Sequence, residues 1–392
     1  MMNPLRALRD FFKKGDVVLL LLCLLASGAG LLLIYSATRY DAALHSFALK
    51  QAVFTCMGVV LYFIITFIDI EFLMEKWWWV ILLLGLAVIL LIKPFGRDDG
   101  TGNRSWVFIP GLPFGFQPGE IAKLAYVAVF SWLLNRERKK GVGRFSAILK
   151  YLALTGLMAG LLAVLSSDFG MVLVYLSLFI IMAWVGGVSK WWFIGVGGGG
   201  LAAAAGLCTF ILPHTRYWTD YRILRFRVVF DHSLDPSGVG WQQSRSLIAI
   251  GSGKLTGMGY LHGRQTQSAY SSSLPARHTD FIFSVCGEEF GFVGCALLLL
   301  LLLAIILRCA WVSRRAKSPM SCFMAMGFAG MLMVQVLLNV GMCLYVTPVI
   351  GLTLPFVSYG GSSTLTLFIA MGIVSGIKMR SLPSWLKDRS EL

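Results

Sequence analysis

The chain has 392 residues, of which 57% are hydrophobic and only 14% are charged, and its formal net charge is +15. A soluble domain averages about 25% charged residues, so this composition excludes a water-surrounded core and requires lipid as the solvent. The long apolar stretches do not alternate with polar residues, which favours transmembrane helices over a β-barrel. In such a chain the positive charge indicates anionic lipid or an anionic lipid-linked substrate rather than nucleic acid.

Eight cysteines are scattered through the chain without the paired spacing that zinc sites and redox motifs use. Nearly all lie in or beside apolar segments, where a free cysteine behaves as a small hydrophobic side chain. The residues alone therefore predict neither a disulfide framework nor a metal site.

Ten stretches are long and apolar enough to cross a bilayer, which takes roughly 20 residues. The predicted spans are 17–36, 49–68, 77–94, 117–135, 147–166, 169–187, 191–212, 281–309, 320–346 and 358–379. The basic N-terminal segment is followed by no small-residue cleavage site in the expected place, so the first span is predicted to be retained. We expect an all-α, polytopic membrane protein that forms a single domain over residues 1–392.

Four clusters of Arg and Lys set the orientation of these spans. They lie at 6–14, 136–150, 308–317 and 378–389, and ten spans place all four on one side of the membrane. The positive-inside rule makes that side the cytoplasm, with both termini inside. The one long loop, 213–279, then lies outside the membrane between the seventh and eighth spans. Its basic residues fit either a pyrophosphate group or lipid headgroups.

Charged residues inside predicted spans are costly unless they are paired or hydrated. Glu120 and Lys123 are three residues apart on one helix face near the outer surface, where they form either a structural or a functional ion pair. Asp168 opens the sixth span and suits an N-cap. Glu288 and Glu289 are expected to face the protein interior or a hydrated cavity, with Gln335 and Asn339 as candidate partners. That expectation rests on the same cost of burying charge.

Asp280 joins the long loop to the eighth span, directly after Arg277-His278-Thr279. As a helix cap it would be stabilised in its ionised form by the helix dipole. As a catalytic base it would need a raised pKa or a positioned substrate proton, and His278 could tune it. The position alone favours a cap.

Two glycine-rich segments need separate interpretation. Gly195–Gly200 has the GxGxxG spacing but lies in an apolar span without a preceding strand, so it predicts close helix packing rather than dinucleotide binding. The segment Pro355–Ser363 predicts an ordered turn entering the last span. Its amides and hydroxyls could bind phosphate oxygens, and helix capping with close packing explains them equally well.

Six motifs occur in an order that resembles the SEDS family, named for shape, elongation, division and sporulation. They are Gly102–Trp106, Phe116–Lys123, Asp168–Gly170, His278–Phe283, Gly287–Gly291 and Pro355–Ser363. The segments Ile248–Gly253 and His262–Gln267 are similar to the RodA branch. Gly119, Ser167 and Ala276 depart from the residues that are usual in the family, and none of them is the expected catalytic carboxylate.

The resemblance implies a peptidoglycan glycosyltransferase of the bacterial cytoplasmic membrane. Such an enzyme polymerises lipid II, carried on undecaprenyl pyrophosphate, at the outer face for elongation and shape, with division or sporulation as other roles. The resemblance also implies a class B penicillin-binding protein as partner and a divalent cation, Mg²⁺ or Mn²⁺, as a cofactor. Asp280 matches the family's essential aspartate, expected to be the general base, and Glu120 and Lys123 match the family's Glu and Lys of the fourth helix, expected to be catalytic as well.

Substrate binding is assigned to Arg104, Arg277, His278, Ser358, Ser362 and Ser363. Two alternatives to polymerisation remain open. One is a flippase for lipid II, with Lys123, Glu288 and Glu289 lining a pathway. The other is a non-catalytic membrane scaffold for wall-synthesis proteins.

Overall fold

The computed structural model describes residues 4–39, 44, 46–97, 103–111, 115–198, 221–231, 238–270 and 273–381. Helices dominate this part of the chain, as the composition predicts. They are α1 (Pro4–Lys14), α2 (Val17–Thr38), α3 (Ser46–Phe67), α4 (Ile70–Leu90), α5 (Ile92–Phe95), α6 (Pro118–Arg138), α7 (Phe145–Leu165), α8 (Phe169–Val185), α9 (Lys190–Trp192), the π-helix η1 (Phe193–Gly197), α11 (Tyr221–Phe230), α12 (Val239–Ser252), α13 (Ile282–Arg314), α14 (Pro319–Cys343) and α15 (Gly361–Met379).

Within the described residues, seven helices are long and apolar enough to cross a membrane. They are α2, α3, α4 with α5, α7, α13, α14 and α15. The apolar α8 is shorter, and α6 carries a buried ion pair near its start. The prediction of a mostly helical protein with several membrane spans is confirmed, while the count of ten spans stays a prediction. The predicted span 191–212 is described only as far as residue 198.

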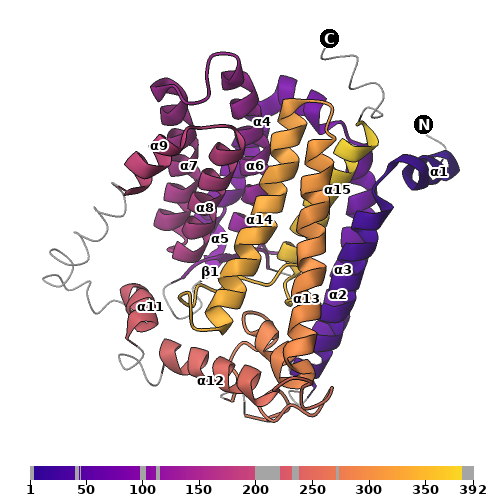
Figure 1. The fold of residues 1–392 in the computed structure, drawn as a ribbon, viewed down its shortest axis with the longest axis vertical. Coiled ribbons are helices and arrows are strands. Elements are labelled where there is room, and N and C mark those ends of the chain that lie inside the picture. Colours follow the sequence, from indigo (N-terminus) through magenta and orange to yellow (C-terminus); the bar gives the residue numbers. More distant parts are fainter. Residues whose placement is uncertain are drawn as a thin grey trace, which may run out of the picture.

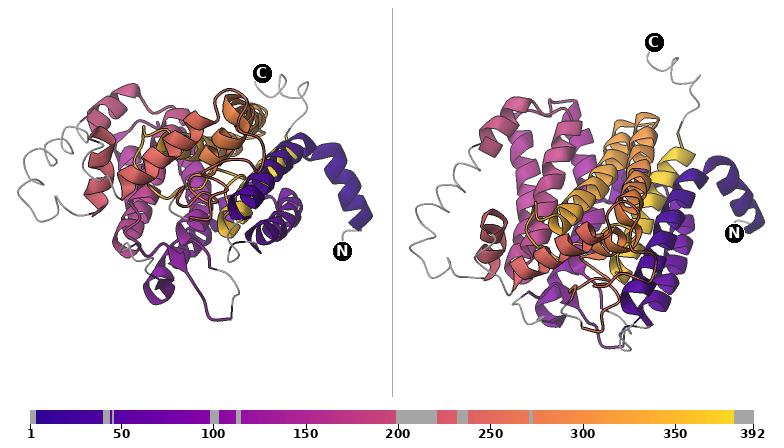
Figure 2. Two further views of the ribbon diagram at one scale, coloured as in Figure 1. Left: turned by 90° about the horizontal axis from the view of Figure 1, so that it is seen from below. Right: turned by 60° about the horizontal axis from the view of Figure 1, so that its bottom comes forward.

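The long helices form a bundle in which segments distant in sequence lie side by side (Figure 1). Neighbouring pairs include α3 with α15, α13 with α14, and α4 with α6. Glycines permit the closest approach, because a Cβ on Gly58 would lie 2.5 Å from the Phe368 ring and one on Gly372 would lie 3.0 Å from the Tyr62 carbonyl oxygen. The amphipathic α1 projects sideways from one end of this bundle (Figure 2).

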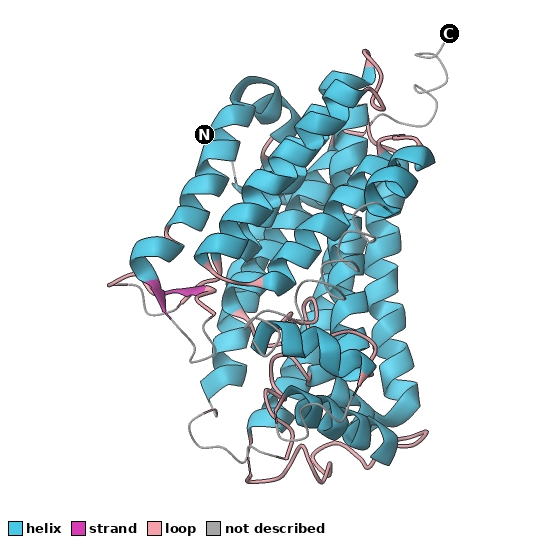
Figure 3. Cartoon of the chain, turned by 90° about the vertical axis from the view of Figure 1, so that its left-hand side faces the viewer, coloured by secondary structure: helices cyan, strands magenta, loops and turns pink. Residues whose placement is uncertain are grey.

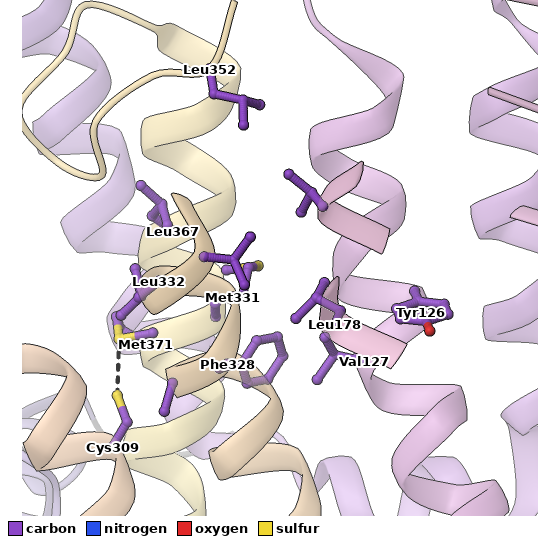
Figure 4. Packing of buried hydrophobic residues seen from close by; sticks show 14 of the residues in the cluster. Tyr126, Val127, Leu178, Cys309, Phe328, Met331, Leu332, Leu352, Leu367 and Met371 are labelled. Atoms are coloured by element: carbon purple, nitrogen blue, oxygen red, sulfur yellow. Dashed lines mark hydrogen bonds between the residues drawn. The ribbon is translucent and has the colours of Figure 1, made fainter. Parts of the chain in front are cut away.

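Apolar side chains from α6, α8, α14 and α15 fill the middle of the bundle (Figure 4). Those drawn include Val127, Leu178, Phe328, Met331 and Leu367. The Cys309 thiol lies 3.5 Å from the sulfur of Met371, so this cysteine packs as a hydrophobic side chain, in agreement with the sequence interpretation.

A buried acid ties several helices together at the end of the bundle that carries α1. Asp16 caps α2 by accepting a hydrogen bond from the Leu19 amide. Its carboxylate also accepts bonds of 2.9–3.1 Å from the Arg308 guanidinium and lies 3.5 Å from Lys378 Nζ. This cluster joins the start of α2 to the ends of α13 and α15.

The opposite end carries α11, α12 and the loops that follow them (Figure 1). The two strands β1 (Gly96–Arg97) and β2 (Trp106–Val107) pair antiparallel there, which the all-α expectation missed (Figure 3). The predicted loop 213–279 contains α11 and α12, so much of its described part is helical. Residues 213–220, 232–237 and 271–272 of this loop lie outside the described residues.

The predicted eighth span is broken near its outer end. Gly291 has φ +66° and ψ −162°, which no helix contains, and it divides α13 into a short first part and a long second part. The segment 254–259 inserts at this break, because the Phe292 amide donates to the Lys254 carbonyl and the Met258 amide donates to the Glu288 carbonyl, each at 2.9 Å. The predicted span 281–309 corresponds to the candidate membrane helix Ile282–Arg314, which is broken at this glycine.

Candidate active site around Asp280

Asp280 lies just before α13, in a turn whose backbone carbonyls accept hydrogen bonds from other parts of the chain. The Tyr359 amide donates to the His278 carbonyl at 2.9 Å, and the Ser358 hydroxyl donates to the Thr279 carbonyl at 2.6 Å. The amide of Asn339 donates to the Asp280 carbonyl at 2.9 Å. Three successive carbonyls are thus each held by a donor from α14 or from the segment before α15.

The expected capping role of Asp280 is not realised. The N-cap of α13 is Phe281, and no side-chain capping bond is formed at this helix start. Asp280 is half-buried, and a Cβ on Gly351 would lie 3.8 Å from its Oδ2. The backbone of Asp280 is fixed while its carboxyl is left out of the helix end, which is the arrangement a general base needs.

The surroundings of Asp280 shift its acidity toward neutral pH. Removal of water from the carboxyl raises its pKa to about 6, and the negative charge of Asp168 acts in the same direction. The positive charge of Arg225 and a hydrogen bond with Thr279 oppose this rise in pKa. A carboxyl with a pKa near 6 is ionised at neutral pH and accepts a proton more readily than an ordinary aspartate.

Arg225 on α11 was not singled out from the sequence. The loop 213–279 contains eight Arg and Lys against three Asp, and the sequence does not distinguish among them. The charge of Arg225 acts on Asp280, which shows that α11 brings a cation to this site. The signal available from the sequence was the basic character of the loop as a whole.

Asp168 is the N-cap of α8, with its Oδ1 accepting from the Met171 amide at 3.0 Å. Its Oδ2 accepts from the Ser105 hydroxyl at 2.6 Å and from the Gln117 amide group at 3.1 Å. These bonds account for both oxygens, so the structure gives Asp168 a structural role and agrees with the cap interpretation. Arg104, next to Ser105, has an exposed side chain beside this anchor.

The Glu120–Lys123 pair lies in the first turns of α6, with Lys123 Nζ 2.8 Å from Glu120 Oε1 and both side chains buried. In the described part of the protein, Glu120 Oε2 is buried without a hydrogen-bond partner. The start of α6 is connected to the site through Gln117, whose backbone amide donates to the Ser362 hydroxyl at 3.3 Å.

Arg277 and Glu288 both bind the backbone of the segment 265–268. The Arg277 guanidinium is buried and donates to the carbonyls of residues 265, 266 and 268 at 2.7–3.2 Å. The Glu288 carboxylate accepts from the amides of Gln265 and Thr266, each at 2.8 Å. Both charged groups bind the protein's own backbone, so their role is to position this segment.

Glu289 and the remaining predicted site residues are also engaged in contacts. Glu289 accepts from the Ser36 hydroxyl at 2.5 Å and from the Gln267 amide group at 2.9 Å. Ser363 lies 3.0 Å from the Thr353 hydroxyl. The His278 ring packs edge-on against Phe47 and near Tyr359, while Asn339 also donates to the Leu352 carbonyl. The described residues of the six motifs therefore lie at one end of the bundle.

A divalent cation would need oxygen ligands near the reacting groups. No group of three or more His, Cys, Asp or Glu in the described ranges is arranged to hold a metal ion. Asp168 already uses both carboxyl oxygens, which leaves Asp280 as the carboxylate at this site that could contribute a ligand. A cage made of protein side chains does not fit these residues.

Comparison with known proteins identifies the family of this chain. The family model described as "Cell cycle protein", which covers FtsW, RodA and SpoVE, matches residues 16–382. The peptidoglycan glycosyltransferase MrdB of Escherichia coli K12 is 35% identical over 363 residues, which is 92% of each chain.

Two solved structures have the same fold. One, described as "Structural coordination of polymerization and crosslinking by a peptidoglycan synthase complex", has a TM-score of 0.75 at 29% identity, covering 93% of this chain and 97% of that one. The rod shape determining protein RodA of Thermus thermophilus has a TM-score of 0.67 at 26% identity, covering 94% and 98%. From the family match and these likenesses, the chain belongs to the FtsW/RodA/SpoVE family of membrane proteins, the SEDS family, and is similar to its RodA branch.

Proposed function

We propose that this protein is a peptidoglycan glycosyltransferase that polymerises lipid II, with Asp280 as the general base. The observation that carries the proposal is the fixed backbone of residues 278–280 combined with a carboxyl that makes no capping bond to α13. The motif order, the family match and the curated name of the E. coli relative support the same activity.

The reaction joins an acceptor sugar hydroxyl to the anomeric carbon of a donor sugar. As the hydroxyl oxygen attacks, its proton passes to the Asp280 carboxylate and the bond between the anomeric carbon and the pyrophosphate oxygen breaks. The electron pair leaves with undecaprenyl pyrophosphate. A pKa of about 6 keeps Asp280 ionised at neutral pH and close to the range in which general bases act best.

The leaving group is a pyrophosphate and needs positive charge as it departs. Arg225 on α11 and the exposed Arg104 are the cations that we assign to this task. Arg277 and Glu288 act as positioning residues, since their side chains hold the 265–268 segment. The Glu120–Lys123 pair lies at the start of α6, and Gln117 just before it donates to Ser362 in the first turn of α15.

Mg²⁺ or Mn²⁺ dependence remains a proposal. Magnesium is often held by one or two carboxylates together with substrate phosphates, so Asp280 and the pyrophosphate oxygens are the ligands we would test. When bound there, the ion would supply Lewis-acid stabilisation of the leaving group. Proton transfer to Asp280 and stabilisation of the leaving group by Arg225 and Arg104 use side chains of this chain alone.

We further propose the membrane arrangement that the basic clusters indicate. Ten spans with both termini in the cytoplasm place Asp280 and the loop 213–279 at the outer face of the bacterial cytoplasmic membrane. There the substrate's polyprenyl tail can stay in the bilayer throughout the reaction. Similarity to RodA and to a peptidoglycan synthase complex supports a role in cell elongation with a class B penicillin-binding protein as partner.

A lipid II flippase is the alternative function. It was suggested by the charged residues Lys123, Glu288 and Glu289, and each of these has a partner within the described protein. Charges that have partners inside the protein favour polymerisation over a hydrated transport pathway.

One experiment separates the two functions. Purified protein with its partner receives fluorescent lipid II in detergent, and glycan strands are resolved on a gel. In parallel, proteoliposomes report translocation of the same lipid. Polymer in the first assay supports the proposal, whereas translocation without polymer would assign the protein to transport. Normal polymer from Asp280→Ala would remove Asp280 from its proposed role.

A further inference from the structure

A groove of about 360 Å³ lies between α4, α6 and α7, away from the candidate active site. Its walls are formed mainly by apolar side chains, including Leu82, Leu154 and Leu157. Trp78 and Trp132 line it as a stacked pair, with ring centroids 4.1 Å apart and an interplanar angle of 13°. Such a groove on a membrane protein suits a hydrocarbon chain.

Charged residues line one end of the same groove. The Arg136 guanidinium lies 5.2 Å from the Trp132 ring, and the Lys150 ammonium lies 2.6 Å from Glu137 Oε1 with half of its side chain exposed. The connection 136–150 contains six Arg and Lys and one acid. This end of the groove therefore carries net positive charge, at the level where lipid headgroups lie if the basic clusters face the cytoplasm.

The groove is charged at one end and apolar along the rest of its length, which matches the headgroup and acyl chain of a phospholipid. Leu157 is two helical turns beyond Lys150 on α7, so the groove extends roughly 10 Å from the charged end into the apolar region. Arginine held against an aromatic ring keeps its N–H groups free to bind phosphate oxygens. We infer that this groove binds one anionic phospholipid of the leaflet at this end, with an acyl chain along Trp132 and Leu154 and the phosphate on Arg136 and Lys150.

Native mass spectrometry in mild detergent tests the inference. The protein is titrated with phosphatidylglycerol and, separately, with phosphatidylcholine of the same chain length. We expect the first bound phosphatidylglycerol to have roughly tenfold or greater affinity over phosphatidylcholine, because two cations at the membrane surface attract an anionic headgroup.

Two variants remove different halves of the site. Arg136→Gln with Glu137→Gln and Lys150→Gln removes the cations without leaving a buried carboxylate unpaired. Ala153→Trp fills the groove and leaves the charges in place, because Ala153 lines it. We expect both variants to lose the preference for the anionic lipid. The matched control, Arg314→Gln with Arg315→Gln, removes two cations at the end of α13, where the Arg315 guanidinium lies 3.9 Å from the Trp311 ring, and should keep the preference.

Equal affinity for the two lipids in the wild-type protein would overturn the inference. So would a preference that survives both variants, or one that the control variant loses to the same extent. A dimer that forms in place of lipid adducts and is broken by Ala153→Trp would assign the groove to a second copy of the chain, which also contradicts the inference.

Discussion

The two ends of the bundle hold two aspartates in opposite ways. At one end Asp16 is fully buried, caps α2 and accepts several bonds from Arg308, so its carboxylate is committed to joining helices. At the other end the backbone carbonyl of Asp280 is hydrogen-bonded, whereas its carboxyl makes no capping bond to α13. Both acids lie beside a helix start in a protein rich in buried charge. The difference shows that the bonding and burial of the carboxyl, rather than its position beside a helix start, separate a structural acid from a candidate catalytic one.

The largest effect is expected from Asp280→Asn. Loss of a general base should lower the rate of lipid II polymerisation by roughly 10² to 10⁴-fold. The fold should persist, because the Asp280 carbonyl and not its carboxyl holds the turn. Steady-state polymer formation measures the rate, and elution of the complex with its partner checks the fold. Asp168→Asn is the matched control, since asparagine also caps helices well and should leave the rate within about tenfold.

Asp16→Ala should produce the reverse pattern. Breaking a buried ion pair by removing one partner costs roughly 3 kcal/mol, because Arg308 would be left without its carboxylate. Thermal unfolding in detergent should show a lower Tm, while the rate per folded molecule stays near the wild-type value. A large loss of rate at unchanged Tm would contradict the structural role of this acid.

The pH dependence follows from the pKa of Asp280. Because this pKa is about 6, polymerisation should fall as pH drops through 6 and be about tenfold below its plateau at pH 5. Asp168→Asn removes a negative charge that raises this pKa, so it should move the acid limb to lower pH. A pH–rate profile for both proteins gives the comparison, and an unchanged acid limb in Asp168→Asn would contradict the coupling.

The pH dependence of protein stability should also reflect the raised pKa of Asp280. Folding raises the pKa of Asp280 above its unfolded value, so the folded state favours the protonated form. Its contribution to stability is fully present below the unfolded pKa and is lost as pH rises through about 6. Asp280→Asn should therefore lose less stability than the wild-type protein between pH 5 and pH 7. Parallel Tm curves for the two proteins over this range would be evidence against a raised pKa.

A smaller effect is expected from Ser358→Ala. This hydroxyl accepts from the Leu354 amide and donates to the Thr279 carbonyl next to Asp280, and a lost bond of this kind costs about 1 kcal/mol. We expect a several-fold fall in kcat with little change in KM for lipid II. Ser363→Ala is the control, since Ser363 contacts Thr353 and not the 278–280 turn. Equal effects of the two changes would make the Ser358 contact incidental.

The sequence predicted the helical membrane architecture and the place of Asp280 just before a membrane-spanning helix. Both follow from signals that can be read along the chain, namely long apolar runs and the order of the motifs. It missed the break at Gly291, since a glycine in an apolar run is compatible with a continuous span and the inserted segment lies more than 30 residues earlier. It also favoured a cap at Asp280, whereas the backbone at Phe281 takes that position without a side-chain bond.

The sequence was least able to predict the partners and roles of individual charged residues. Arg225 is one of eight basic residues in the loop 213–279, and only the placement of α11 distinguishes it. Arg277 and Glu288 were expected at a substrate site or a pathway, because sequence marks a buried charge as costly but does not name its partner. The structure supplies those partners in the backbone of residues 265–268.

The most direct test of the central claim separates binding from chemistry at Asp280. Lipid II is bound to wild-type protein and to Asp280→Asn in the presence of the partner, and a single turnover is followed after rapid mixing with the remaining components. We predict that Asp280→Asn binds lipid II with wild-type affinity and forms no glycosidic bond on the wild-type timescale. A normal single-turnover rate in this variant would contradict the assignment of Asp280 as the general base.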